Sequence, residues 1–285
     1  MKPLDGQFVD AGGVRTHYLE AGDGPYLVLL HGGGIGNDAR LTWHKNIEPL
    51  SAYFHVIAFD QLGFGKTDVP QDPAQFTRLN RTKHTLDVLD ALGIDKATLA
   101  GHSEGGLIAS KIAVDHSRRV EKLVIVTSGN TAPKLGDERD KVWMQASRDA
   151  YRWDMAAASE DAFVVNFKRG MLYHPERIDA ELLRANYQEA RQSGNMHNYL
   201  NLPAEETDPE PYYALAQQHV HPHLPQLEIE SLLIWATGDP TVPVERGLRL
   251  MEMIAHAEMH IFDRAKHMVM IDASDGFNRL LSVFR

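Results

Sequence analysis

The chain has 285 residues, 43% of them hydrophobic, which is long enough for one large α/β domain with an insertion. Its formal net charge of -10 at pH 7 argues against nucleic acid or an anionic membrane as a partner. It has no cysteine, which excludes disulfides, a thiolate nucleophile and a thiolate metal site. Residues 1–13 lack an apolar segment and no run approaches membrane-spanning length, so a cytoplasmic protein is expected.

Short apolar runs alternate with helical patterns through the first part of the chain. Strands are predicted at residues 14–20, 26–30, 55–59, 97–100 and 120–127, and helices near 43–52, 80–92 and 106–115. This alternation is typical of a doubly wound α/β fold with a mostly parallel sheet.

The pattern changes after about residue 133. Charged helical stretches at 137–151 and 180–193 show no β period, and strand-like runs return at 232–236 and 259–262. We therefore expect a helical cap at 133–227, inserted between two parts of the sheet domain at 1–132 and 228–285, and lying over the active site.

The pentapeptide Gly101-His102-Ser103-Glu104-Gly105 follows a predicted strand and precedes a predicted helix. A serine in a G-x-S-x-G sequence at such a turn is the nucleophile of an elbow, where flanking glycines leave room for a strained backbone. The structural alternative is a turn of small residues that only lets the helix pack on the strand. We predict that Ser103 is a nucleophile.

The strand at 26–30 ends in His31-Gly32-Gly33-Gly34. A glycine-rich loop there can offer backbone N–H groups to a developing oxyanion, and we predict that Gly33 and Glu104 supply them. A rival interpretation is a dinucleotide site, because Gly34-x-Gly36-x-x-Ala39 has Asp60 about 20 residues further on. That pattern, however, does not directly follow the strand.

Two further candidates come after the elbow, each just past a strand-like run. Asp239 follows the run at 232–236, and His267 follows the run at 259–262. The chain order Ser, Asp, His is the order of the triad in this type of fold. His267 would take the proton of Ser103, and Asp239 would fix the tautomer of the imidazole. Taken separately, Asp239 could be a turn aspartate and His267 one of 15 surface histidines.

Residues 8–68 carry a closer likeness to a known family. The matching residues are Ala11-Gly12-Gly13-Val14, Tyr18-Leu19-Glu20-Ala21-Gly22, His31-Gly32-Gly33-Gly34, Asn46-Ile47, and Asp60 through Leu62-Gly63-Phe64-Gly65-Lys66-Thr67. With the elbow, these make the chain resemble the α/β-hydrolase superfamily, and within it the meta-cleavage-product hydrolases. That family cuts a carbon–carbon bond in dienoates made by ring-opening dioxygenases. The likeness spans most of the sheet domain and fades in the cap.

The chain departs from the family at its substrate pocket. The family has asparagine before the nucleophile and methionine after it, where this chain has His102 and Glu104. The family's carboxylate-binding arginine of the cap aligns with Asn186, and its tryptophan after the catalytic histidine aligns with Met268. The resemblance thus implies a changed acid-binding pocket. We expect substrate contacts from Gly34, Thr42, His102, Asn186 and Met268.

Charged groups around this pocket allow opposite interpretations. Glu104 has a structural use at a helix N-terminus, and it could also repel acidic substrates. Arg184, Lys168 and Arg169 would rebuild an anion site if the cap aimed them inward.

Three histidines alternate in a segment predicted to return from the cap as a solvated loop. They are His219, His221 and His223, and no acidic or cysteine partner is evident, so no metal site is predicted.

The favoured function is a cofactor-independent serine hydrolase of a small organic molecule, cleaving a carbon–carbon bond of a ring-cleavage-type ketone. An ester or lactone is the alternative substrate. A ligand receptor built on the same fold is the second class of function. The sequence leaves open whether identical chains assemble into an oligomer.

Overall fold

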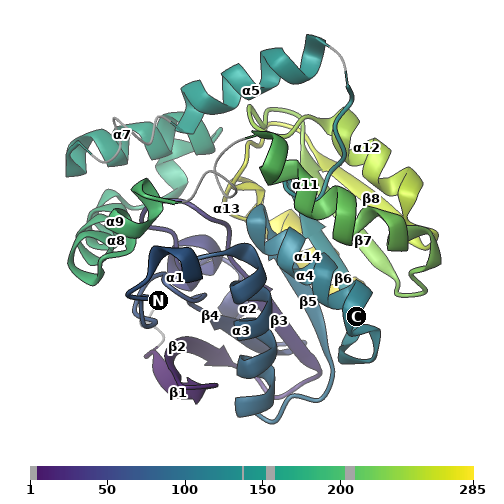
Figure 1. The fold of residues 1–285 in the computed structure, drawn as a ribbon, viewed down its shortest axis with the longest axis horizontal. Helices are drawn as coiled ribbons and strands as arrows, with labels where there is room; N and C mark the ends of the chain where they lie inside the picture. The colour runs from purple at the N-terminus through teal and green to yellow at the C-terminus, as the bar shows by residue number, and fades with distance from the viewer. Residues whose placement is uncertain (1–4, 137, 152–157, 203–208) are drawn as a thin grey trace.

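A mostly parallel sheet of eight strands runs through the computed structural model, which describes residues 5–136, 138–151, 158–202 and 209–285 (Figure 1). The strands are β1 (Gln7–Ala11), β2 (Val14–Ala21), β3 (Tyr26–Leu30), β4 (His55–Phe59), β5 (Ala97–His102), β6 (Val120–Val126), β7 (Ser231–Ala236) and β8 (Ala257–Phe262). Their order is β1-β2-β4-β3-β5-β6-β7-β8. The pairs β1–β2 and β2–β4 are antiparallel, and every later neighbour is parallel. This confirms the predicted fold class.

Helices cover both faces of the sheet, as the continuous apolar character of the central strands requires. In β3, Leu27 and Leu29 pack into one hydrophobic cluster, whereas Val28 and Leu30 pack into the other. The first cluster includes α1 (Ala39–Trp43), α2 (Ile47–Leu50), α13 (Val269–Asp272) and α14 (Ser274–Val283). The second includes α3 (Arg78–Ala91), α4 (Glu104–Asp115) and α12 (Val244–Met253).

A group of helices comes between β6 and β7 in the chain. They are α5 (Glu138–Tyr151), α7 (Glu160–Met171), α8 (Ala180–Ser193), α9 (Asn195–Leu200) and α11 (Pro209–His219). Figure 1 shows α5 and α7 across the top of the view, with α8 and α9 beside α1. Phe163 of α7 and Leu183 of α8 join the cluster of α1, whereas Ala216 of α11 joins the cluster on the other face.

The predicted cap is only partly described, because residues 137, 152–157 and 203–208 lie outside the described ranges. Its bounds at 133 and 227 therefore stay a prediction. One part of that prediction is wrong: the return from the cap is not a loop. Helix α11 reaches His219, and a 3₁₀ helix follows at His221–Gln226, where Leu224 is fully buried and anchors the segment.

Two elements differ from the sequence prediction near the N-terminus. Strand β1 was not predicted, because it is a largely exposed edge strand without an apolar run. Its hairpin with β2 turns at Gly12 and Gly13, which have φ of 64° and 88° and so suit a two-residue turn. The helix expected at 43–52 is two short helices, α1 and α2, separated at Asn46.

Candidate active site

Ser103 occupies the turn between β5 and α4 with φ 53° and ψ −118°, a left-handed conformation that side chains rarely adopt. The flanking glycines are required by space. A Cβ added to Gly101 would lie 2.1 Å from the carbonyl oxygen of Gly105, and one added to Gly105 would lie 2.4 Å from that of Leu30. The sharp turn holds the serine at the carboxyl end of the central strand.

His267 and Asp239 form a buried pair beyond the ends of β8 and β7. The Nδ1 atom of His267 lies 2.8 Å from Oδ2 of Asp239, and their side chains are 3% and 0% exposed. The other carboxylate oxygen, Oδ1, accepts hydrogen bonds from the backbone N–H groups of Thr241 (2.7 Å) and Val242 (3.2 Å). An ionised carboxylate accepts from all of these donors, so Nδ1 of His267 carries the proton and Nε2 is left as a base.

His102 contacts the backbone and the ring of His267. Its Nε2 donates to the backbone carbonyl of His267 at 3.1 Å, and the two rings have centroids 4.7 Å apart. Burial holds the pKa of His102 well below its usual value, and a positive charge on His267 would lower it further, so His102 is neutral. The carbonyl of His267 also accepts from Oγ1 of Thr127 at 3.0 Å, which fixes the histidine loop. A direct substrate contact of His102 stays a prediction.

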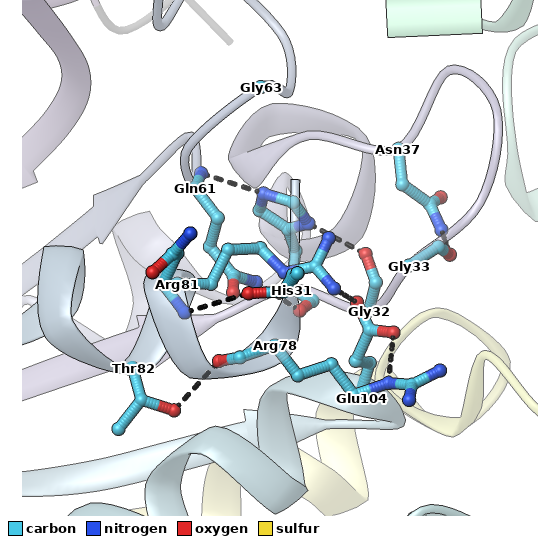
Figure 2. A network of polar contacts seen from close by, with 12 residues as sticks. His31, Gly32, Gly33, Asn37, Gln61, Gly63, Arg78, Arg81, Thr82 and Glu104 are labelled. Atoms are coloured by element: carbon cyan, nitrogen blue, oxygen red, sulfur yellow. Dashed lines mark hydrogen bonds and ion pairs between the residues drawn. The ribbon is translucent and has the colours of Figure 1, made fainter. Parts of the chain in front are cut away.

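The glycine-rich loop passes directly over the serine. A Cβ added to Gly32 would lie 2.9 Å from the Cβ of Ser103, and one added to Gly33 would lie 3.0 Å from Oε1 of Glu104. Figure 2 shows this loop with Gly32 and Gly33 beside Glu104, and Asn37 donating from its side chain to the carbonyl of Gly33. The loop and the first turn of α4 therefore approach each other at Ser103, as an oxyanion hole requires.

His31 fixes the start of the loop as a neutral imidazole. Its Nε2 accepts the backbone N–H of Gln61 at 3.0 Å, so Nδ1 is protonated and donates to the carbonyl of Gly32 at 2.8 Å. Burial lowers the pKa of His31, in agreement with this tautomer. The loop is thus held in place by a side chain of its own first residue.

The carboxylate of Glu104 is buried between two arginines of α3. Arg78 donates through Nε to Oε2 at 2.9 Å, and Nη2 of Arg81 lies 2.8 Å from Oε1 (Figure 2). Burial alone would raise the pKa of Glu104, but the two guanidinium groups bring it below its usual value. Neither arginine was predicted as a site residue, although their spacing of three residues places them on one side of a helix.

Two of the predicted substrate residues make hydrogen bonds within the protein. Asn186 of α8 donates from Nδ2 to the carbonyl of Gly36 at 2.9 Å. The backbone N–H of Met268 donates to the carbonyl of Met171 in α7 at 3.1 Å. Both contacts join the inserted helices to the sheet domain, and Met268 is only 1% exposed.

The other two predicted substrate residues belong to the glycine loop and to α1. Gly34 has a φ of 117°, which favours glycine at this position. Thr42 is fully buried, and within the described structure its hydroxyl has no hydrogen-bond partner.

In the rival dinucleotide interpretation Asp60 would bind a ribose hydroxyl, but its carboxylate already has partners within the protein. Its Oδ1 accepts from the backbone N–H of Ala39 at 2.9 Å, and its Oδ2 accepts from that of Lys66 at 2.9 Å and lies 2.7 Å from Nδ1 of His17. The carboxylate is 2% exposed, so it braces α1 and is not available to a ribose.

Two further observations cover the described residues only. Among them, no three histidine, cysteine, aspartate or glutamate side chains gather as metal ligands would. No helix in the described ranges is both long and apolar enough to cross a membrane.

A serine at a strained elbow, a buried histidine–aspartate pair and a glycine loop on one mostly parallel sheet define the hydrolase class of α/β proteins. The family model of the alpha/beta hydrolase fold matches residues 25–274, and the chain belongs to that family.

Within the family, the chain is similar to the 2-hydroxymuconate semialdehyde hydrolase of Pseudomonas sp. (strain CF600). The two are 30% identical over 99% of this chain and 94% of that protein. It is 29% identical to the 2-hydroxy-6-oxo-2,4-heptadienoate hydrolase of Pseudomonas putida (strain F1), over 98% of this chain and 95% of the relative. A mutant meta-cleavage product hydrolase of Pseudomonas fluorescens IP01, solved with acetates, superposes with a TM-score of 0.83 and 29% identity over 98% of this chain and 97% of that one. The resemblance seen in the sequence is thereby confirmed.

Proposed function

We propose that this hydrolase cleaves a carbon–carbon bond in a meta-cleavage-type dienoate, using Ser103, His267 and Asp239 and no cofactor. The observation that carries the proposal is the buried hydrogen bond between His267 and Asp239, together with the strained elbow of Ser103 under the glycine loop. The similarity to relatives named for such substrates supports the choice of substrate.

In the first step, Nε2 of His267 takes the proton of Ser103 while Oγ attacks the ketone carbon. Asp239 keeps the proton on Nδ1 and stabilises the imidazolium that forms. The carbonyl oxygen becomes an oxyanion, and the backbone N–H groups of Gly33 and Glu104 donate to it. These donors act in a largely buried site, where each is worth more than in water.

In the second step, the tetrahedral intermediate collapses and the carbon–carbon bond breaks. Its electron pair goes to the dienoate fragment, which takes the proton back from the imidazolium and leaves. The acyl group stays on the serine until a water, deprotonated by the same imidazole, attacks it and releases the acid. Water is the only other reactant, and no change of oxidation state requires a redox partner.

The helices of residues 133–227 are proposed to form the cap over this centre. The contact of Asn186 with Gly36 and that of Met268 with Met171 support the proposal, because they attach α8 and α7 to the loops that carry the site. A cap fixed in this way limits the access of water to the site.

The test is turnover of 2-hydroxy-6-oxo-2,4-heptadienoate, followed as loss of the dienolate absorbance, with release of the acid fragment checked by chromatography. Ser103→Ala should remove nearly all turnover and leave the fold intact. Ser110→Ala, a change to a buried serine of α4 whose Oγ donates to the carbonyl of Gly106 at 2.7 Å, is the matched control and should keep activity. Wild-type protein that binds the dienoate but leaves it whole would refute carbon–carbon hydrolysis.

Two alternatives are separated by the same experiment. A panel of chromogenic esters and lactones tests for an esterase or lactonase, which would turn these over much faster than the dienoate. A ligand receptor would bind without turnover of any substrate in the panel.

A further inference from the structure

A threonine hydroxyl contacts both side chains of the buried histidine–aspartate pair. Thr241 follows Asp239 by two residues and is itself buried. Its Oγ1 lies 2.7 Å from Oδ1 of Asp239 and 2.9 Å from Nδ1 of His267. The same Nδ1 lies 2.8 Å from Oδ2 of Asp239. The hydroxyl is therefore within hydrogen-bond distance of each partner in the bond on which the proposed reaction depends.

The protonation of the three groups determines which of them donates. An ionised carboxylate only accepts, so the single proton of the Thr241 hydroxyl goes to Oδ1 of Asp239. The lone pairs of Oγ1 are then left for Nδ1 of His267, which carries the imidazole proton. That proton is shared between two acceptors, the carboxylate of Asp239 and the hydroxyl oxygen of Thr241.

The turn after β7 does not need this hydroxyl. Pro240 has no N–H group, and Oδ1 of Asp239 accepts from the backbone N–H groups of Thr241 at 2.7 Å and Val242 at 3.2 Å. These two bonds close the turn whichever side chain residue 241 carries. What the hydroxyl adds is the contact with His267, which lies 26 residues further along the chain.

We propose that Thr241 is a positioning residue of the catalytic site, and that its hydroxyl holds Asp239 and His267 in the arrangement that activates Ser103. The inference rests on the proposed function for the roles of these three residues. In the transition state the imidazole becomes an imidazolium, and a charged N–H donates a stronger hydrogen bond than a neutral one. The second acceptor therefore stabilises the transition state more than the ground state, and this difference raises the rate.

Removing the hydroxyl should slow the activation of Ser103 without weakening ligand binding. Thr241→Val deletes the hydroxyl and keeps a branched side chain of similar size. The expected loss of rate is about tenfold, the usual difference between a hydrogen bond to a charged group and one to a neutral group. Thr241→Ser keeps the hydroxyl and should restore most of the rate. Binding should not change, because the hydroxyl contacts Nδ1, the nitrogen that does not exchange a proton with the serine.

The measurement is the labelling of Ser103 by a fluorophosphonate probe, followed by mass spectrometry at several probe concentrations. This series separates the maximal rate of labelling, which should fall in Thr241→Val, from the dissociation constant of the probe, which should stay the same. The probe reacts with an activated serine whatever the natural substrate is. Failure of this inference is thus distinct from failure of dienoate hydrolysis, which turnover tests.

Thr237→Val is the matched control. Thr237 directly follows β7, and its hydroxyl also donates to an aspartate, Asp263, at 3.0 Å, but that aspartate is exposed and lies outside the site. Its loss should leave both labelling parameters unchanged.

A second background separates the contact with His267 from a packing effect. In Asp239→Asn an amide NH₂ takes the place of Oδ2 and donates to Nδ1 of His267, so that nitrogen has no proton to share with Thr241. Adding Thr241→Val to this variant should change its residual labelling rate by less than about twofold. An equal loss in both backgrounds would show that the hydroxyl acts independently of the pair, and would overturn the inference.

Circular dichroism and thermal unfolding establish that each variant is folded, and Thr241→Ala takes the place of Thr241→Val if the latter does not fold. Slower labelling of the valine variant with recovery in Thr241→Ser supports the inference. A wild-type rate in Thr241→Val, a serine variant as slow as the valine variant, or an equal loss in the control overturns it. Wild-type protein that the probe does not label has no activated serine and overturns it as well.

Discussion

Replacing Asp239 by asparagine should inactivate the enzyme by reversing the tautomer of His267. The orientation of the new side chain follows from the donors around it. Two backbone N–H groups, from Thr241 and Val242, point at Oδ1, so the asparagine oxygen takes that place. Its NH₂ group then faces Nδ1 of His267, which must accept a hydrogen bond and lose its proton. The proton moves to Nε2, where the base is needed.

The size of the loss follows from this reversal. The corresponding change in the chymotrypsin template lowers kcat by roughly 10⁴, which is about 5 kcal/mol of transition-state stabilisation. The buried geometry here is comparable, since both side chains are excluded from water and the Nδ1–Oδ2 distance is 2.8 Å. We expect kcat of Asp239→Asn to fall by about 10⁴ with little change in KM, because the substrate does not touch Asp239.

The assay is steady-state turnover of whichever substrate the wild-type protein cleaves, with Asp263→Asn as the control at an exposed carboxylate. Near-normal activity of Asp239→Asn would refute the reasoning and show that another carboxylate orients His267. In this type of fold the acid can also lie after β6. That position is Asn130 here, and an asparagine cannot replace the carboxylate of Asp239.

Two further predictions use other methods. A fluorophosphonate probe should label Ser103, as read by mass spectrometry of the digested protein, and active protein without that label would exclude a serine nucleophile. Burial, and then the nearby Asp60, raise the pKa of Asp38 to about 7, so the folded state keeps a proton that the unfolded state releases above about pH 4. The contribution of protonated Asp38 to the free energy of unfolding is present in full below the ordinary pKa of an aspartate, and it is lost as pH rises through about 7. Asp38→Asn should therefore stabilise the protein at pH 8 relative to pH 5, by about 1 to 3 kcal/mol in urea unfolding, and equal effects at both pH values would contradict the shift.

The strands at 26–30 and 55–59 could be predicted to the residue because a strand buried on both faces is a continuous apolar run. β1 could not, since its pairing depends on the hairpin at Gly12 and Gly13 and not on its own hydrophobicity. The break between α1 and α2 could not be predicted either, because it depends on contacts that are distant in the chain. Asn46 donates to the carbonyl of Met270 and to Asn278, partners more than two hundred residues away in the chain.

The candidate site shows the same division. The places of Ser103, Asp239 and His267 just beyond the ends of β5, β7 and β8 could be predicted, because the carboxyl ends of parallel strands meet at one edge of the sheet. The pairing of Glu104 with Arg78 and Arg81 could not, because it depends on how α3 packs beside α4. The hydrogen bond from Asn186 to the carbonyl of Gly36 could not be predicted either, because no local pattern encodes it.

At position 103 the residue that catalysis needs lowers thermal stability, because the left-handed backbone is strained for any residue except glycine. A non-glycine residue held there costs of order 1–3 kcal/mol, which the packing of β5 and α4 must offset. Alanine would keep that strain and glycine would relieve it. An inactive Ser103→Gly protein should therefore melt at a higher temperature than Ser103→Ala, and a screen for heat resistance alone would select against the enzyme's own nucleophile.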